Sequence, residues 1–190
     1  MTFELEPKLV PRIFDQRIAE EVSNAFSESP KNLRIFFAAV ASCSPFLYSQ
    51  ILKEKRWLLN IIDDKNFNIL SLLEPLKLEP FDSLYLKLRK AKKRAALWIA
   101  LNDLAGVWSL EAVTKNLSAF AEKAINLSWR ASFLKEFKKG KFPKHYHSDP
   151  DKVGFFILAM GKLGAYELNY SSDIDLICFF DEDLYSHEES

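Results

Sequence analysis

The sequence predicts a mainly α-helical region followed by the opening strands of an α/β unit. Through most of the chain, apolar residues recur at the spacing of one helix face, and the 190 residues include only five glycines. Near the end, two short apolar runs bounded by glycines and polar residues are typical of buried strands. We place the boundary at the basic, proline-containing stretch Lys138–Lys144, so that residues 1–144 form the helical region and residues 145–190 begin the second domain.

The first predicted helices are short. One pattern begins at Arg12, and its apolar residues follow helical spacing: Phe14, Ile18, Val22 and Ala25. A second helix is expected over Lys31–Ser42. A third should begin at Ser44-Pro45, because serine caps a helix N-terminus and proline suits its first turn. A short helix is expected over Phe67–Leu73.

Two longer helices are predicted next. The first follows Pro80, with Asp82 as its expected cap and Gly106 at its end. The second is capped by Ser109 and continues toward Phe137. The first of these helices carries one apolar stripe: Leu84, Leu88, Ala91, Ala95 and Trp98.

The same helix carries a cluster of cations on its outer face: Lys87, Arg89, Lys90, Lys92, Lys93 and Arg94. Such a cluster suits contact with a nucleotide, RNA or an acidic partner. It also suits a solvated helix face, and we favour that interpretation because no aromatic residues alternate with the cations to stack on bases.

The second predicted strand opens with two carboxylates. Successive side chains of a strand point to opposite faces, so Asp173 and Asp175 should project from one face while Ile174 and Leu176 enter a core. Two adjacent carboxylates repel one another, and a Mg²⁺ ion would compensate, because it binds one or two carboxylates together with water and phosphate. The alternative is a solvated turn or strand edge.

Two further features bear on ligands. A glycine turn at Gly161, between the two predicted strands, offers backbone N–H groups to a phosphate. His145 and His147 are spaced to share a metal in a strand, but no cysteine or third histidine lies nearby, and a loop is the simpler interpretation.

These residues resemble the polymerase-β-like nucleotidyltransferases, whose pattern is a glycine turn followed by Asp-x-Asp on a strand. Within that superfamily the chain is similar to the bifunctional glutamine synthetase adenylyltransferase/adenylyl-removing enzymes. The similarity is carried by Met160–Gly164, Glu167–Asn169 and Ser171–Ile177. The Glu-Leu-Asn sequence and the long helical lead from Met1 resemble the N-terminal, adenylyl-removing unit.

The resemblance implies a nucleotidyltransferase domain that is incomplete in this chain. It implies that Asp173 and Asp175 are catalytic and bind Mg²⁺, and that nucleotide or phosphate contacts come from Gly161, Lys162, Ser171 and Ser172. The implied reaction removes AMP from a tyrosine of glutamine synthetase by phosphorolysis, giving ADP, and the full-length enzyme also adenylylates it from ATP. The implied partners are glutamine synthetase, the PII signal protein, ATP or ADP, and phosphate, in the regulation of nitrogen assimilation.

One departure from the superfamily pattern concerns a third carboxylate on a later strand. Asp181, Glu182 and Asp183 lie at the far end of the second predicted strand and are poor substitutes, so we expect the chain alone to lack full activity. Two alternatives remain. One is a related PII uridylyltransferase, whose turn resembles Gly-x-Gly-Arg rather than Gly161–Gly164. The other is a non-catalytic helical interaction fragment.

The composition indicates a cytoplasmic protein. Lys and Arg number 26 and Asp and Glu number 26, so no net charge draws the chain toward nucleic acid or membrane. Cys43 and Cys178 match no ligand spacing, and Cys178 is expected to be a buried thiol in a reducing compartment. The N-terminus has no signal-peptide pattern, and no apolar run is long enough to span a bilayer.

Overall fold

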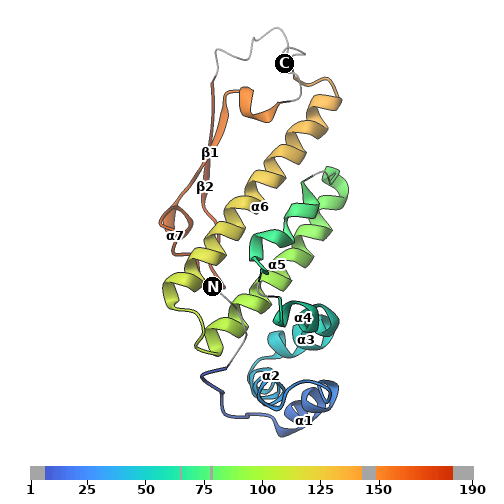
Figure 1. Cartoon of the computed structure of the whole chain (residues 1–190). Coiled ribbons are helices and arrows are strands. Elements are labelled where there is room, and N and C mark those ends of the chain that lie inside the picture. Colours follow the sequence, from blue (N-terminus) through green and yellow to red (C-terminus); the bar gives the residue numbers. More distant parts are fainter. Residues whose placement is uncertain (1–6, 65, 78, 143–148, 182–190) are drawn as a thin grey trace.

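A computed structural model describes residues 7–64, 66–77, 79–142 and 149–181. Four short helices gather at one end, two long antiparallel helices form the body, and a small sheet lies beside the second long helix (Figure 1). The elements are α1 (Gln16–Ala25), α2 (Lys31–Cys43), α3 (Pro45–Lys53), α4 (Lys55–Ile62), the 3₁₀ turns η1 (Ile69–Leu72) and η2 (Glu74–Leu76), α5 (Phe81–Leu104), α6 (Leu110–Lys138), η4 (Pro150–Lys152), β1 (Phe155–Ala159), α7 (Gly161–Gly164) and β2 (Leu176–Phe180).

The short helices follow the predicted signals closely. The Ser44 side chain accepts a hydrogen bond from the Leu47 N–H, so the predicted start of α3 is confirmed. The first helix begins later than predicted, because Asp15 caps it through the Ile18 N–H. Phe14 therefore lies before the helix and is 89% exposed, which corrects its place in the apolar stripe. The segment predicted as a short helix over Phe67–Leu73 contains the 3₁₀ turn η1.

The main core joins the short helices to the long pair. Its largest fully buried side chains include Phe26, Phe36, Phe37 and Trp98. The rings of Phe26 and Phe37 are 5.0 Å apart, and Phe67 meets Trp98 edge-on at 5.5 Å. Aromatic contacts therefore join the end of α1 to α2 and the segment before η1 to α5.

The turn between α5 and α6 depends on Gly106. Its φ of +66° lies in the left-handed region that favours glycine, and the following Val107 N–H donates to the Asn102 carbonyl. The predicted end of α5 at this glycine is therefore confirmed. The Ser109 side chain accepts from the Ala112 N–H and begins α6 as predicted.

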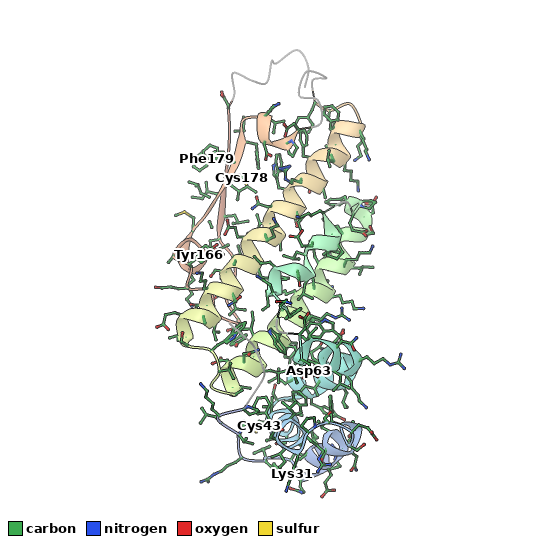
Figure 2. All side chains as sticks on the ribbon, viewed as in Figure 1. Lys31, Cys43, Asp63, Tyr166, Cys178 and Phe179 are labelled. Atoms are coloured by element: carbon green, nitrogen blue, oxygen red, sulfur yellow. The ribbon has the colours of Figure 1, made fainter. Side chains whose placement is uncertain are left out.

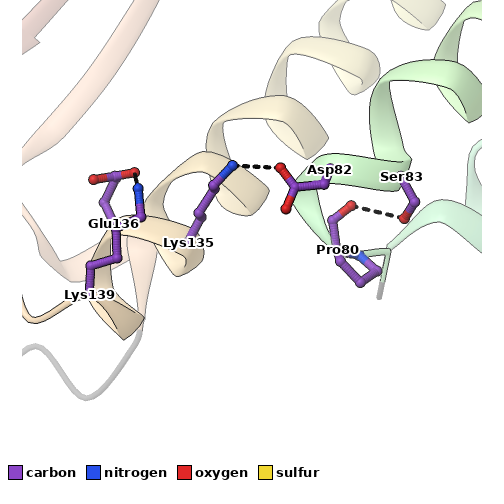
Figure 3. A network of polar contacts seen from close by, with 6 residues as sticks. All are labelled: Pro80, Asp82, Ser83, Lys135, Glu136 and Lys139. Atoms are coloured by element: carbon purple, nitrogen blue, oxygen red, sulfur yellow. Dashed lines mark hydrogen bonds and ion pairs between the residues drawn. The ribbon is translucent and has the colours of Figure 1, made fainter.

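The predicted role of Asp82 as a cap is wrong. Pro80 occupies the cap position of α5 and offers no side-chain hydrogen bond, so Asp82 lies inside the first turn. Its carboxylate instead forms an ion pair with Lys135 of α6, with 2.6 Å between the charged atoms (Figure 3). The Lys135 ammonium also lies 4.3 Å from the centre of the Phe81 ring, so this contact closes the open end of the helix pair.

The two strands pair antiparallel, with Phe155 opposite Phe180 and Ile157 opposite Cys178. The face that carries Ile157 and Cys178 is turned toward α5 and α6, because both residues line a cavity with side chains of those helices. Phe155 stacks on Trp129 of α6 at 3.9 Å and attaches this face at one end.

Much of the sheet is exposed, which corrects two expectations. Ile174 and Leu176 were expected in a core but are 41% and 39% exposed, and Cys178 is exposed rather than buried. The physical reason is that the inner face borders a cavity of about 530 Å³ instead of packed side chains. On the outer face, Phe179 points away from α6 (Figure 2) and stacks on Phe156 at 5.0 Å.

Among the described residues, no helix combines the length and apolar character needed to cross a membrane.

We predict that Phe37→Ala lowers the free energy of unfolding by about 3–5 kcal/mol, because it removes a fully buried ring and leaves a cavity. Urea denaturation followed by circular dichroism measures the change. Phe14→Ala is the matched control and should change stability by less than about 0.5 kcal/mol, since that ring is exposed. Equal losses in the two variants would contradict the described packing.

Candidate functional site

The predicted site residues come together in one cavity of about 370 Å³ beside the end of β1. Its lining comprises all six residues named from the sequence, with one addition, Asn169: Gly161, Lys162, Asn169, Ser171, Ser172, Asp173 and Asp175. The sequence separates the glycine turn from the Asp-x-Asp segment by about ten residues, and the antiparallel pairing of β1 with β2 brings them together at this cavity.

Backbone contacts hold the two parts of this cavity together. The Met160 N–H, at the end of β1, donates to the Asp175 carbonyl at 2.9 Å. Gly161 follows with φ +55°, and a Cβ atom built on it would lie 3.6 Å from the Asp175 Oδ2 atom. Glycine therefore suits this position because of its backbone conformation, and it brings the start of α7 against the Asp175 carboxylate.

Gly164 closes the turn for a different reason. A Cβ atom at this position would lie 2.4 Å from the Ala159 carbonyl oxygen, which is too close for any other residue without a backbone shift. The short helix α7 therefore folds back tightly on the end of β1, and this packing fixes the direction in which Gly161 and Lys162 leave the strand.

The serine pair is ordered by Asn169. The Asn169 Oδ1 atom accepts hydrogen bonds from the Ser171 N–H at 3.1 Å and from the Ser172 hydroxyl at 2.8 Å. This is the local turn that asparagine commonly forms with the backbone two residues later. Asn169 was not predicted to be a site residue, although an asparagine shortly before two serines is a recognisable turn signal.

Asp173 and Asp175 lie just before β2 rather than within it, because the strand begins at Leu176. Both carboxylates are exposed, and both line the cavity. The donor set of carboxylate, hydroxyl and amide oxygens suits a hard cation such as Mg²⁺, which needs only one or two protein carboxylates. In the part of the chain that the structure describes, no group of three or more His, Cys, Asp or Glu side chains is placed to hold a metal.

The structure places Asp181 away from this cavity. Its N–H donates to the Gly154 carbonyl at 2.8 Å, so it lies at the opposite end of β2 from Asp175, as predicted. Glu182 and Asp183, the other two acidic residues considered there, lie outside the described residues, as do His145 and His147.

Three contacts from alternate residues attach the segment before the serine pair to the long helices. The Tyr166 hydroxyl donates to Glu122 of α6, and the Leu168 N–H donates to the Ser118 hydroxyl at 3.1 Å. The Tyr170 hydroxyl donates to Asp103, near the end of α5, at 3.1 Å. The loop that carries Asp173 and Asp175 is therefore positioned by α5 and α6.

The pKa shifts of two tyrosines agree with this arrangement. Partial burial and the adjacent Asp103 charge raise the pKa of Tyr170. The hydrogen bond to Glu122 raises the pKa of Tyr166. Both hydroxyls therefore remain protonated at neutral pH and act as donors toward the helices.

The sequence comparisons identify the family. The profile of the family described as glutamate-ammonia ligase adenylyltransferase matches residues 36–189, which is most of the chain. The matched range contains both the helical pair and the cavity with its two carboxylates. The chain belongs to this family of adenylyltransferases.

Several curated relatives carry the name bifunctional glutamine synthetase adenylyltransferase/adenylyl-removing enzyme. One from Bradyrhizobium sp. strain BTAi1 is 37% identical over 80% of this chain and 16% of its own length. Another from Bartonella quintana is 37% identical over 85% of this chain and 16% of its own length. The chain thus spans about a sixth of the length of these relatives. No solved structure matches the chain.

We predict that Ser118→Ala lowers the free energy of unfolding by about 1–3 kcal/mol, because it leaves the buried Leu168 N–H without its acceptor. Hydrogen exchange at the Leu168 amide should accelerate in the same variant. Ser128→Ala on the same helix is the control, because among the described residues the Ser128 hydroxyl bonds only to the Ala124 carbonyl one turn earlier. Unchanged exchange at Leu168 in Ser118→Ala would show that this contact does not hold the segment before the serine pair.

Proposed function

We propose that this chain carries the nucleotide-handling site of an adenylyl-removing unit, which takes AMP from an adenylylated tyrosine of glutamine synthetase by phosphorolysis and releases ADP. The observation that supports the proposal most directly is the single cavity lined by Gly161, Lys162, the serine pair and the two carboxylates. Membership of the adenylyltransferase family and the names of the relatives support the substrate.

In the proposed reaction, an oxygen of inorganic phosphate attacks the phosphorus of the adenylyl group. The bond from that phosphorus to the tyrosine oxygen breaks, and the leaving phenolate takes up a proton to restore tyrosine. The new phosphorus–oxygen bond joins AMP to phosphate as ADP. The main task of the protein is to position the reactants and to neutralise charge, as in other phosphoryl transfers.

Residues on two sides of the cavity would position the reactants and neutralise their charge. Lys162 and the backbone at Gly161 line the cavity on the α7 side and would contact a phosphate there, because a positive charge favours an anion. Ser171 and Ser172 lie on the other side, and Asn169 orients them toward the same space. Asp173 and Asp175 would hold Mg²⁺, which when bound supplies charge neutralisation at the non-bridging oxygens.

The wider role is proposed by the same reasoning. In a protein of the relatives' length, a second unit would adenylylate glutamine synthetase from ATP, and the PII signal protein would regulate both activities in nitrogen assimilation. We also propose that the third carboxylate of the site comes from sequence beyond these residues and that the protein works in the cytoplasm.

We predict that Asp175→Asn abolishes adenylyl removal in a chimera in which this chain replaces the matching segment of the Bradyrhizobium relative. The expected loss is at least about 100-fold in the rate of ADP formation from adenylylated glutamine synthetase and phosphate, because charge stabilisation at the reacting group is lost.

The matched control for this prediction is Asp63→Asn, which makes the same change at the end of α4, far from Tyr166 and the site (Figure 2). It should retain nearly the full rate. Near-normal phosphorolysis by the Asp175→Asn chimera would refute the catalytic assignment, and a chimera that is inactive before substitution would refute the functional equivalence of the two segments.

A second prediction concerns the metal. A site that binds Mg²⁺ only in the folded chain should raise the free energy of unfolding by about 1.4 kcal/mol when Mg²⁺ is ten times above its Kd. Thermal denaturation with increasing MgCl₂ measures this, with Asp173→Asn/Asp175→Asn as the variant and NaCl of equal ionic strength as the salt control. No Mg²⁺-specific rise in the wild-type chain would favour a non-catalytic helical fragment.

A further inference from the structure

The structure places five of the six cations of the α5 cluster in two groups. Lys87 forms an ion pair with Glu79, and Arg94 pairs with Glu54 at 2.7 Å while its guanidinium lies 5.0 Å from the centre of the Trp57 ring. These cations have structural partners. Arg89, Lys92 and Lys93 instead line a cavity of about 610 Å³, so they do not simply form a convex solvated face.

This cavity lies between the start of α3, the middle and end of α5, and Tyr170, which directly precedes the serine pair. It combines the three cations with an apolar wall built by Phe46, Leu47, Ala96, Ala100 and Leu104. Tyr170 adds an aromatic ring. No aromatic residues alternate with the cations along α5, but Phe46 of α3 and Tyr170 both supply aromatic rings to this cavity.

The positive charge of this cavity is largely uncompensated. Asp103 is the one carboxylate among its described lining residues, and it accepts the hydrogen bond from Tyr170. In the described part of the chain, neither Lys92 nor Lys93 forms an ion pair with a carboxylate within 4.0 Å. Arg89 is held in place by Tyr85, whose hydroxyl accepts from its guanidinium at 2.8 Å.

We propose that this cavity binds an organic anion of the nucleotide type, with a phosphate group on the three cations and an aromatic body on the apolar wall. Its volume lies within the range of small-molecule sites, which combine apolar walls with a few convergent polar groups. An exclusively inorganic anion would leave the apolar wall unused, and an uncharged aromatic ligand would leave the cations without a partner.

This site is separate from the candidate catalytic cavity, because the two share no lining residue. They are nevertheless linked through the chain, since Tyr170 lines the anion cavity and directly precedes Ser171. The inference rests on the charge and shape of the cavity and does not depend on the proposed phosphorolysis.

The test is isothermal titration of the 190-residue chain with ATP in EDTA, so that no divalent metal supports binding at Asp173 and Asp175. We expect saturable binding that Arg89→Gln/Lys93→Gln weakens at least about tenfold, because charged hydrogen bonds to the phosphates are lost. Ala100→Trp fills the apolar part of the cavity without a change in charge and should also weaken binding.

Lys90→Gln/Lys115→Gln is the matched control, because it removes two cations that do not line the cavity. It should change the affinity by less than about twofold, as expected for exposed charges at moderate salt. Thermal denaturation of each variant checks folding, and the charge variant decides the question if Ala100→Trp does not fold.

Several outcomes would overturn the proposal. Absence of saturable ATP binding would refute it, as would an equal loss in the Lys90→Gln/Lys115→Gln control, which would indicate general attraction to positive charge. Lys162→Gln removes the cation of the candidate catalytic cavity, so a loss of ATP binding in that variant would place the nucleotide there instead. Tripolyphosphate that binds as tightly as ATP would exclude a role for the aromatic body, and adenosine that binds as tightly would exclude a role for the cations.

Discussion

The pairing of α5 with α6 is the constraint on which the other parts of the structure depend. Phe67, in the segment before η1, packs edge-on against Trp98 of α5, and the sheet attaches to α6 through the stacking of Phe155 on Trp129. Gly106 sets the turn at one end of the pair, and the Lys135–Asp82 ion pair closes the other. Because both ends are fixed, the two regions share one rigid support.

The geometry of the candidate site depends on this pair of helices. The carboxylates lie on a loop with no regular hydrogen-bond ladder of its own, and exposed loops are usually the least ordered parts of a fold. Here, contacts to Glu122, Ser118 and Asp103 hold the preceding segment, while the Met160 N–H holds the Asp175 backbone. Residues remote in the sequence therefore hold this exposed site in a fixed arrangement.

Local signals allowed much of the fold and the site to be predicted. Serine caps at Ser44 and Ser109 and the glycine after α5 act within one turn of the chain, so the sequence suffices to find them. The residues that line the candidate cavity could be selected from the sequence because the glycine turn and the Asp-x-Asp segment are short motifs. Asp82, Cys178 and Asn169 were misjudged or missed because their surroundings come from distant elements: an ion pair with α6, a cavity beneath the sheet, and a side-chain turn around the serine pair.

The outer face of the sheet has a practical consequence for work with this chain. Phe156, Leu158, Ile177 and Phe179 lie on it together and are each at least 42% exposed. In the described residues the sheet has only two strands, so each strand also offers an unpaired backbone edge. An apolar face beside open edges is a template for intermolecular strand addition. Isolated at high concentration, the chain should therefore be prone to β-rich aggregation, and aspartate or lysine substitutions on this face should improve its solubility.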